Sequence, residues 1–195
     1  MADQPSIKAT GFQGAADDLA RLVARQGISR AELAARLDPS DFAYLDKQLA
    51  ASSWVPIATY VRVAEILVEL EGRGDAPAYF RARGRKAAER LHKAGVYKQF
   101  DASVETWGKR AGAISTTMGA VLYNFTKWSF EALPERGGFQ IRIDGARAFP
   151  DVLRWVGEGF IEYTSRHQSA NKKLKIEVSS ARPAPDRIVY TVQVT

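Results

Sequence analysis

The sequence contains no cysteine, and this absence removes several kinds of chemistry at once. Disulfide bonds, zinc sites built on thiolates and thiol nucleophiles are all excluded. A chain without cysteine also fits a reducing compartment. No apolar run approaches the roughly 20 residues that a membrane-spanning helix needs, and the polar first ten residues lack the hydrophobic core of a signal peptide. We therefore expect a cytoplasmic protein without a membrane span.

Histidine is scarce too, with only His92 and His167 in 195 residues. Both fall at expected helix ends, where the helix dipole favours a cation, and their spacing matches no metal-ligand pattern. No serine lies in a nucleophile-elbow motif, and the glycines match neither dinucleotide-binding nor P-loop patterns. Glu158 and Glu162 are flanked by arginines, so we expect ion pairs on an exposed helix face. The sequence therefore predicts no enzymatic activity, no catalytic residue, no metal site and no cofactor.

Apolar and basic residues are both plentiful. The chain is 46% hydrophobic and 10% aromatic, which is enough for a packed core. Its net charge is +6, and the surplus falls between Arg73 and Arg110. A basic face of this kind can attract phosphate or acidic partners, although a merely solvated helix face is the alternative. The expected members of this basic face are Arg81, Arg83, Arg85, Lys86 and Arg90.

Apolar residues at helical spacing dominate the first half of the chain. Ser29 followed by Glu32 has the spacing of a capping box, and Gly27 marks the end of the preceding helix. We expect a flexible tail over residues 1–13 and helices over 15–37 (interrupted at 27), 42–49, 53–70 (capped by Ser53), 78–93 and 102–123.

The hydrophobic period then changes from 3.6 to 2, which indicates strands. We expect strands over 127–132, 139–144, 174–178 and 188–194, turns over 134–138 and 182–186, and a helix over 149–166. Gly157 and Gly159 inside this helix predict the close approach of another backbone. The predicted fold class is α+β, a helical N-terminal layer followed by a β-β-α-β-β unit that forms a four-stranded antiparallel sheet. Residues 14–195 should form a single domain, mainly helical over 14–123 and β-β-α-β-β over 124–195.

The C-terminal part resembles a known superfamily. Phe149-Pro-Asp-Val-Leu-Arg-Trp-Val-Gly-Glu-Gly-Phe-Ile-Glu-Tyr163 precedes a strand, a proline-containing loop and a final strand. This arrangement resembles the haem nitric-oxide/oxygen-binding domains, the 4-vinyl-reductase-like domains and the TRAPP vesicle-tethering subunits. Trp54-Val-Pro before the apolar helix with Tyr60 is similar to a related bacterial paralogous family of unknown function. The resemblance covers about residues 40–195 and implies a ligand-binding fold of sensory type.

The chain departs from these families where they hold their cofactors. The haem domains use a proximal histidine and a Tyr-x-Ser-x-Arg clamp for the haem carboxylates. Here the arginine of Tyr163-Thr-Ser165-Arg166 comes one position early. The vinyl-reductase-like domains often carry a cysteine-based metal motif near the last strands, and residues 179–186 contain no such ligand. The resemblance therefore implies the fold, but neither haem nor metal.

We therefore predict a non-enzymatic, cytoplasmic, sensory-type domain that binds a small apolar ligand or a protein partner, a second copy of the chain included. Small-molecule sites are mostly apolar with few polar groups. The pocket is expected between the long apolar helix, the glycine-bearing helix and the sheet. Its candidate residues are Tyr60, Tyr123, Trp128, Phe130, Trp155, Gly159, Phe160 and Tyr163.

Two alternatives stay open. Residues 22–37 are typical of the first half of a helix-turn-helix, which would make the chain a DNA-binding regulator. However, the expected recognition segment, residues 38–47, carries three acids and only Lys47 as a base, so we expect weak non-specific nucleic-acid binding at most. The other alternative is a protein–protein scaffold whose aromatic residues fill a fully packed core.

Overall fold

The computed structural model describes residues 4–96, 107–133, 138–169 and 175–194. Parts of three expected elements, residues 102–106, 134–137 and 174, lie outside these ranges. The chain forms two compact units, unit 1 (Met1–Tyr79 and Leu122–Asn124) and unit 2 (Phe80–Val121 and Phe125–Thr195). This division differs from the predicted single domain over residues 14–195. Helical periodicity runs without a break through two of the three crossing points, in α5 and α7, so the pattern of apolar residues does not mark the boundary there.

Unit 1 is mostly helical and also contains a small two-stranded sheet. Its elements are β1 (Ser6–Lys8), α1 (Ala9–Ala24), α2 (Arg30–Arg36), η1 (Pro39–Asp41), α3 (Phe42–Leu45), β2 (Trp54–Pro56) and α4 (Ile57–Glu71). β1 pairs antiparallel with β2, with Ile7 opposite Val55, and Ile7, Phe12 and Val55 are buried. The prediction of a flexible tail is therefore wrong from Ser6 onward, because this segment contributes to the core.

Local caps shape the rest of unit 1. The predicted capping box is confirmed, since the Ser29 hydroxyl accepts from the Glu32 amide at 3.1 Å and the Glu32 carboxylate accepts from the Ser29 amide at 2.7 Å. The predicted cap at Ser53 is wrong: residues 54–56 pair with β1, so α4 begins only at Ile57, with Pro56 as its N-cap. The expected helix over 42–49 is reduced to the four residues of α3.

Asp41 is buried in unit 1 beneath α4. Its carboxylate accepts hydrogen bonds from Arg62 Nε at 2.6 Å, Arg62 Nη2 at 2.7 Å and Thr59 Oγ1 at 2.6 Å. Burial alone would raise the pKa of Asp41, but the hydrogen bonds from Arg62 and Thr59 outweigh it and hold this pKa below its ordinary value. One acid of the expected recognition segment therefore has a structural role, and the one-turn α3 is too short to be a recognition helix.

Unit 2 contains the predicted β-β-α-β-β arrangement. Its elements are α5 (Ala76–Lys93), α7 (Trp107–Leu122), β3 (Lys127–Leu133), β4 (Gly138–Asp144), η3 (Ala146–Ala148), α8 (Asp151–Gln168), β5 (Ile176–Ala184) and β6 (Arg187–Val194), with one end of α5 and of α7 extending into unit 1. The four strands form one antiparallel sheet in the order β3-β4-β6-β5. The predicted fold class is confirmed. β5 continues to Ala184, through most of the segment predicted as a turn, because residues 181–184 keep an irregular pairing with β6.

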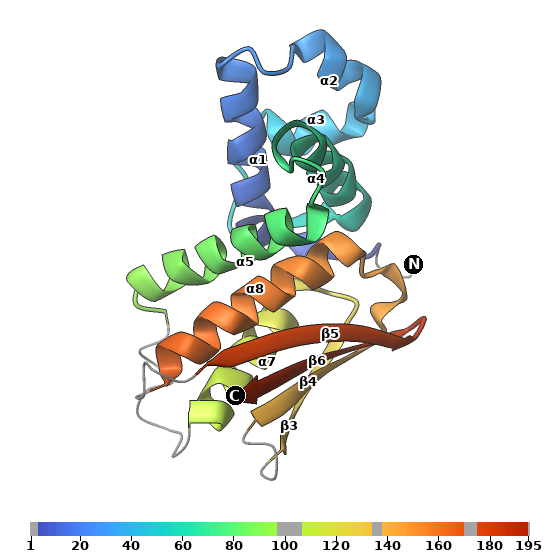
Figure 1. Ribbon diagram of the computed structural model, residues 1–195. Helices are drawn as coiled ribbons and strands as arrows, with labels where there is room; N and C mark the ends of the chain where they lie inside the picture. Colours follow the sequence, from blue (N-terminus) through green and yellow to red (C-terminus); the bar gives the residue numbers. More distant parts are fainter. Residues whose placement is uncertain (1–3, 97–106, 134–137, 170–174, 195) are drawn as a thin grey trace. The chain divides into compact units, whose positions relative to one another are not determined.

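One face of this sheet forms the core of unit 2. Trp128 lies opposite Ile143, and Ile141 lies opposite Tyr190, so alternate residues of three strands share this face. α8 packs on it over β5 and β6 (Figure 1), and α7 packs on it over β3. No helix in the described ranges is both long and apolar enough to cross a membrane.

Candidate functional site

The helices α5 and α8 cross with their backbones in contact. A Cβ atom at Gly84 of α5 would overlap the carbonyl oxygen of Val156, and one at Gly159 of α8 would overlap that of Arg81. Gly159 therefore permits the close backbone approach that its sequence context predicted. Gly157 has a different role, because a Cβ there would collide with the hydroxyl group of Tyr190 on the sheet.

Two arginines of α5 form ion pairs with two glutamates of α8. Arg81 pairs with Glu158, and Arg85 pairs with Glu162 at 2.9 Å. The expected ion pairs are present. However, the Glu158 side chain is only 4% exposed, so the prediction that Glu158 lies on an exposed face is wrong. The reason is that α5 covers this part of α8, which a single-helix pattern does not show.

The expected basic face is correspondingly reduced. Arg81 and Arg85 are neutralised by their glutamate partners, and Arg83 is half-buried. Lys86 and Arg90 remain exposed. The positive charge available to an outside partner is therefore smaller than the sequence suggested.

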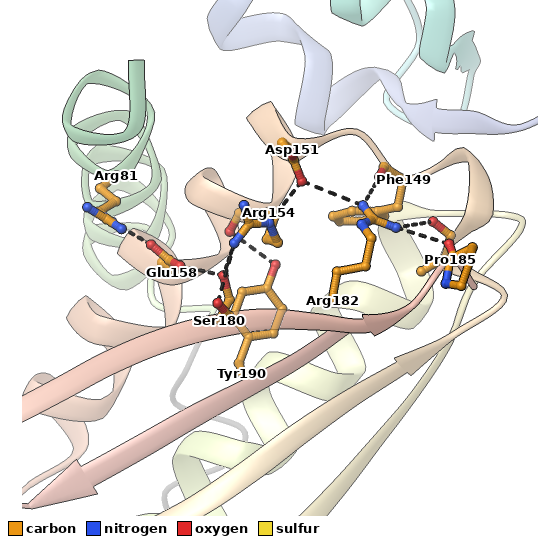
Figure 2. A network of polar contacts seen from close by, with 10 residues as sticks. Arg81, Phe149, Asp151, Arg154, Glu158, Ser180, Arg182, Pro185 and Tyr190 are labelled. Carbon is orange, nitrogen blue, oxygen red and sulfur yellow. Dashed lines mark hydrogen bonds and ion pairs between the residues drawn. The ribbon is translucent and has the colours of Figure 1, made fainter. Parts of the chain in front are cut away.

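Glu158 belongs to a polar network that joins α5, α8 and the sheet (Figure 2). The Ser180 hydroxyl of β5 donates to Glu158, and Arg154 donates to the Ser180 hydroxyl at 2.8 Å and to Asp151 at 2.9 Å. Tyr190 donates to the carbonyl oxygen of Arg154 at 3.1 Å. Buried polar groups of this kind need partners, and this network supplies them.

Arg182 of β5 forms the second part of this network. Its guanidinium donates to the carbonyl oxygens of Phe149 at 2.6 Å, Ala146 at 3.1 Å and Pro185 at 3.2 Å. It thus holds the loop before α8 against the end of the sheet (Figure 2).

Burial raises the pKa of Tyr190 far above its ordinary value, and the charge of Glu158 raises it further, so this phenol stays a donor. The hydrogen bonds of Arg154 and Arg182 indicate that this polar network has a structural role, because these arginines bind backbone carbonyl groups and carboxylates that already have partners.

Sequence reasoning missed a second glycine contact, between α7 and the sheet. A Cβ at Gly112 would overlap the ring of Phe130, and one at Gly119 would overlap the ring of Trp128. The two glycines are seven residues apart, which places them on one face of a helix two turns apart. The contact between α7 and the sheet could have been predicted from this spacing. Trp128 and Phe130 therefore pack directly against the α7 backbone.

The structure distributes the eight candidate pocket residues over several places. Tyr60 and Tyr123 belong to unit 1, and the other six belong to unit 2. The candidate residues of unit 2 are Trp128, Phe130, Trp155, Gly159, Phe160 and Tyr163.

Within each unit these side chains contact different neighbours. Tyr60 is buried in an edge-on contact with Phe12, and Tyr123 is buried where it bridges to Ile7 of β1. Trp128 stacks against Tyr190, and Phe130 lies 5.4 Å from Phe139 between ring centroids. Trp155 stacks on Phe80. Phe160, beside Gly84, and Tyr163 are half-buried. The described contacts of unit 2 do not gather its six candidates around one cavity.

The two histidines lie together at the C-terminal ends of α5 and α8. The ring centroids of His92 and His167 are 4.3 Å apart, and Tyr163 stacks on His167 at the same distance. Both histidines are exposed. Burial, together with the charge of Glu89, raises the pKa of Tyr163. Over the described ranges, no group of three or more histidines and acids is placed to hold a metal ion.

The residues that resemble a haem-carboxylate clamp do not converge. Tyr163, Ser165 and Arg166 lie on α8. Ser165 is two residues after Tyr163 and therefore points about 200° away from it on the helix. Ser165 is fully buried, whereas exposed Arg166 pairs with Glu162 at 2.9 Å.

Comparison with known proteins identifies the fold. No protein-family model matches the chain, and no curated protein does. Among solved structures, it is similar to an H-NOX protein from S. oneidensis in the Fe(II)NO ligation state, with a TM-score of 0.62 and 14% identity over 97% of this chain and 99% of that one. It is also similar to a variant of the H-NOX protein from T. tengcongensis, with a TM-score of 0.60 and 10% identity over 97% of this chain and 98% of that one. An oxygen-binding H-NOX domain related to soluble guanylate cyclases matches 77% of this chain, and 78% of its own, with a TM-score of 0.52 and 11% identity. The chain therefore has an α+β fold similar to that of the H-NOX domains.

Proposed function

We propose that this chain is a non-enzymatic, cytoplasmic sensor-type domain that binds a small apolar ligand and does not use a histidine-ligated haem. Similarity to H-NOX structures over 97% of the chain supports the sensor type, since those proteins are described as binding oxygen or carrying Fe(II)NO. The observation that carries the departure from haem is the position of the histidines. Both lie on the exposed ends of α5 and α8, in contact with each other.

A histidine-ligated haem does not fit the residues of this chain. An axial histidine must approach the iron from inside a protected pocket, and the chain has no other histidine and no cysteine to take this place. α7 faces the sheet with Gly112 and Gly119, and the rings of Trp128 and Phe130 fill the contact. Of the clamp-like residues of α8, buried Ser165 points away from Tyr163, and Arg166 is already paired with Glu162.

An apolar guest is the ligand class that the composition supports. Half-buried aromatic side chains such as Trp155 and Phe160 provide apolar surface on α8, and ligand sites combine such surface with a few polar groups. Native mass spectrometry of the protein purified without added ligand, followed by solvent extraction, tests this. The expected result is a non-covalent adduct that is released on denaturation and recovered in the extract. Phe160→Ala should reduce the adduct, whereas Thr117→Ala on the exposed side of α7 should leave it unchanged.

A protein–protein scaffold is the second candidate, and one observation favours it. In unit 2 the contact between α7 and the sheet is closed, because Gly112 and Gly119 lie directly on aromatic rings. If native spectra show only the mass of the chain and the extract is empty, the scaffold becomes the better function for the same fold.

A further inference from the structure

The face of the sheet opposite α7 and α8 is hollowed into a concavity. It is an open hollow of about 470 Å³, lined by residues of all four strands, and its volume is within the range of small-molecule sites. None of the described helices of unit 2 is among the elements that line it. Most of this lining lies on the side of the sheet away from α7 and α8, and Phe130, whose ring packs on α7, also contributes to it.

Two arginines line the concavity and are held by one carboxylate. Asp144 lies directly opposite Arg187 on the neighbouring strand and two residues after Arg142 on its own. Arg142 Nε donates to Asp144 Oδ2 at 3.0 Å, and Arg187 Nε donates to Asp144 Oδ1 at 3.0 Å. The hydrogen bond from Arg187 and the positive charges of both arginines hold the pKa of Asp144 below its ordinary value. Asp144 thus stays ionised at neutral pH and orients both guanidiniums.

The terminal nitrogens of these guanidiniums remain available for a ligand. Within the described part of the chain, the only hydrogen bonds of Arg142 and Arg187 are those from Nε to Asp144. Both arginines belong to the lining of the concavity, whereas Asp144 does not. Guanidinium groups bind carboxylates through paired, parallel hydrogen bonds, and here two of them border one concavity.

The other side chains that line the concavity indicate the polarity and the charge of the rest of the ligand. Val189 and Pro183 supply apolar surface, and Ser129 supplies a hydroxyl group. Glu131 lies on the same side of β3 as Ser129 and also lines the concavity. The negative charge of Glu131 disfavours a ligand that carries a second negative charge, because like charges at close range repel. We propose that this concavity binds a small monocarboxylate with an apolar body.

Titration with benzoate, followed by NMR of the full chain at constant ionic strength, tests this proposal. Benzoate should bind saturably and shift amide signals of β3, β4 and β6, while neutral benzamide should bind at least about tenfold more weakly, because the charge-assisted hydrogen bonds are lost. Arg142→Gln and Arg187→Gln should each raise the Kd for benzoate about tenfold. Arg142→Lys keeps the charge but loses the paired donors of the guanidinium group, and it should also weaken binding.

Arg147→Gln is the matched control, because it removes the same charge from an exposed residue outside the concavity. It should leave the Kd for benzoate nearly unchanged. Glu131→Gln should strengthen the binding of inorganic phosphate more than that of benzoate. The proposal is overturned if benzamide binds as well as benzoate, if Arg142→Gln and Arg187→Gln behave like Arg147→Gln, or if the shifts fall outside these strands. These outcomes do not depend on whether an apolar guest is found, so the two proposals fail or succeed separately.

Discussion

Gly159 of α8 lies directly against the backbone carbonyl group of Arg81 on α5, so close that any side chain at this position would overlap it. Gly159→Ala should therefore destabilise the fold by about 1–3 kcal/mol, the usual cost of forcing an extra group into a packed contact. Denaturant unfolding measures this change.

Gly108→Ala is the matched control on α7. A Cβ at Gly108 would make only an ordinary contact, 3.7 Å from Phe139, and alanine favours a helix over glycine by up to about 1 kcal/mol. This variant should be neutral or stabilising. Equal effects of the two substitutions would show that the contact between α5 and α8 does not constrain Gly159.

The two glutamates of α8 should differ in their contributions to stability. Glu158→Gln keeps the shape but removes the charge that binds Arg81 and Ser180 in a buried setting, and we expect a loss of about 1–3 kcal/mol in the free energy of unfolding. Glu162→Gln affects more exposed pairs with Arg85 and Arg166 and should cost less than about 1 kcal/mol. Thermal and denaturant unfolding of both variants provide the comparison. A larger loss for Glu162→Gln would contradict the burial described for Glu158.

The buried Asp41 predicts a dependence of unit 1 on acid. The pKa of Asp41 is lowered in the folded state. At acidic pH the unfolded chain therefore binds more protons than the folded chain does. The stabilisation is present above the ordinary aspartate pKa of about 3.9 and is lost as the pH falls toward the lower folded value. Unfolding measured between about pH 5 and pH 2 should show this loss, and Asp41→Asn should be less stable at neutral pH and less sensitive to acid.

Asp46→Asn provides a control for this prediction. Asp46 also pairs with an arginine, Arg30, but both side chains are about half exposed. Exposed pairs contribute little to stability, so this variant should keep the acid sensitivity of the parent. The same acid profile for Asp41→Asn and the parent would contradict the role given to Asp41.

Nucleic-acid binding should be weak and should depend on only part of the basic face. Lys86 and Arg90 are exposed, whereas Arg85 is paired with Glu162. Fluorescence anisotropy with duplex DNA should therefore show weak binding that falls with salt, is lost in Lys86→Gln/Arg90→Gln, and changes little in Arg85→Gln. Tight binding that resists salt and disappears on changing residues 38–47 would favour the DNA-binding regulator.

The sequence predicts the order of the elements in unit 2 because its strands and helices carry clear periods. The alternation at Phe139, Ile141 and Ile143 predicts β4, and Gly159 of α8 indicates a close backbone contact. Periodicity says which residues face inward, but not which element covers them. For this reason Glu158, polar and flanked by arginines, was expected on an exposed face although α5 covers it.

The error at the N-terminus has a similar origin. Residues 6–8 are too few for a recognisable strand pattern, yet pairing with β2 buries Ile7. The candidate pocket residues were grouped because they are aromatic and fall near the junction of helix and sheet. Aromatic side chains also fill cores, and only the positions of Gly112 and Gly119 reveal that Trp128 and Phe130 pack on α7.

The absorption spectrum of the protein purified from haem-supplemented cells tests whether the chain lacks a histidine-ligated haem. We expect no stoichiometric Soret band, and the same spectrum for the parent and the His92→Gln/His167→Gln variant, because neither histidine occupies a protected axial position. A stoichiometric Soret band that shifts on addition of nitric oxide and disappears in the double variant would contradict it.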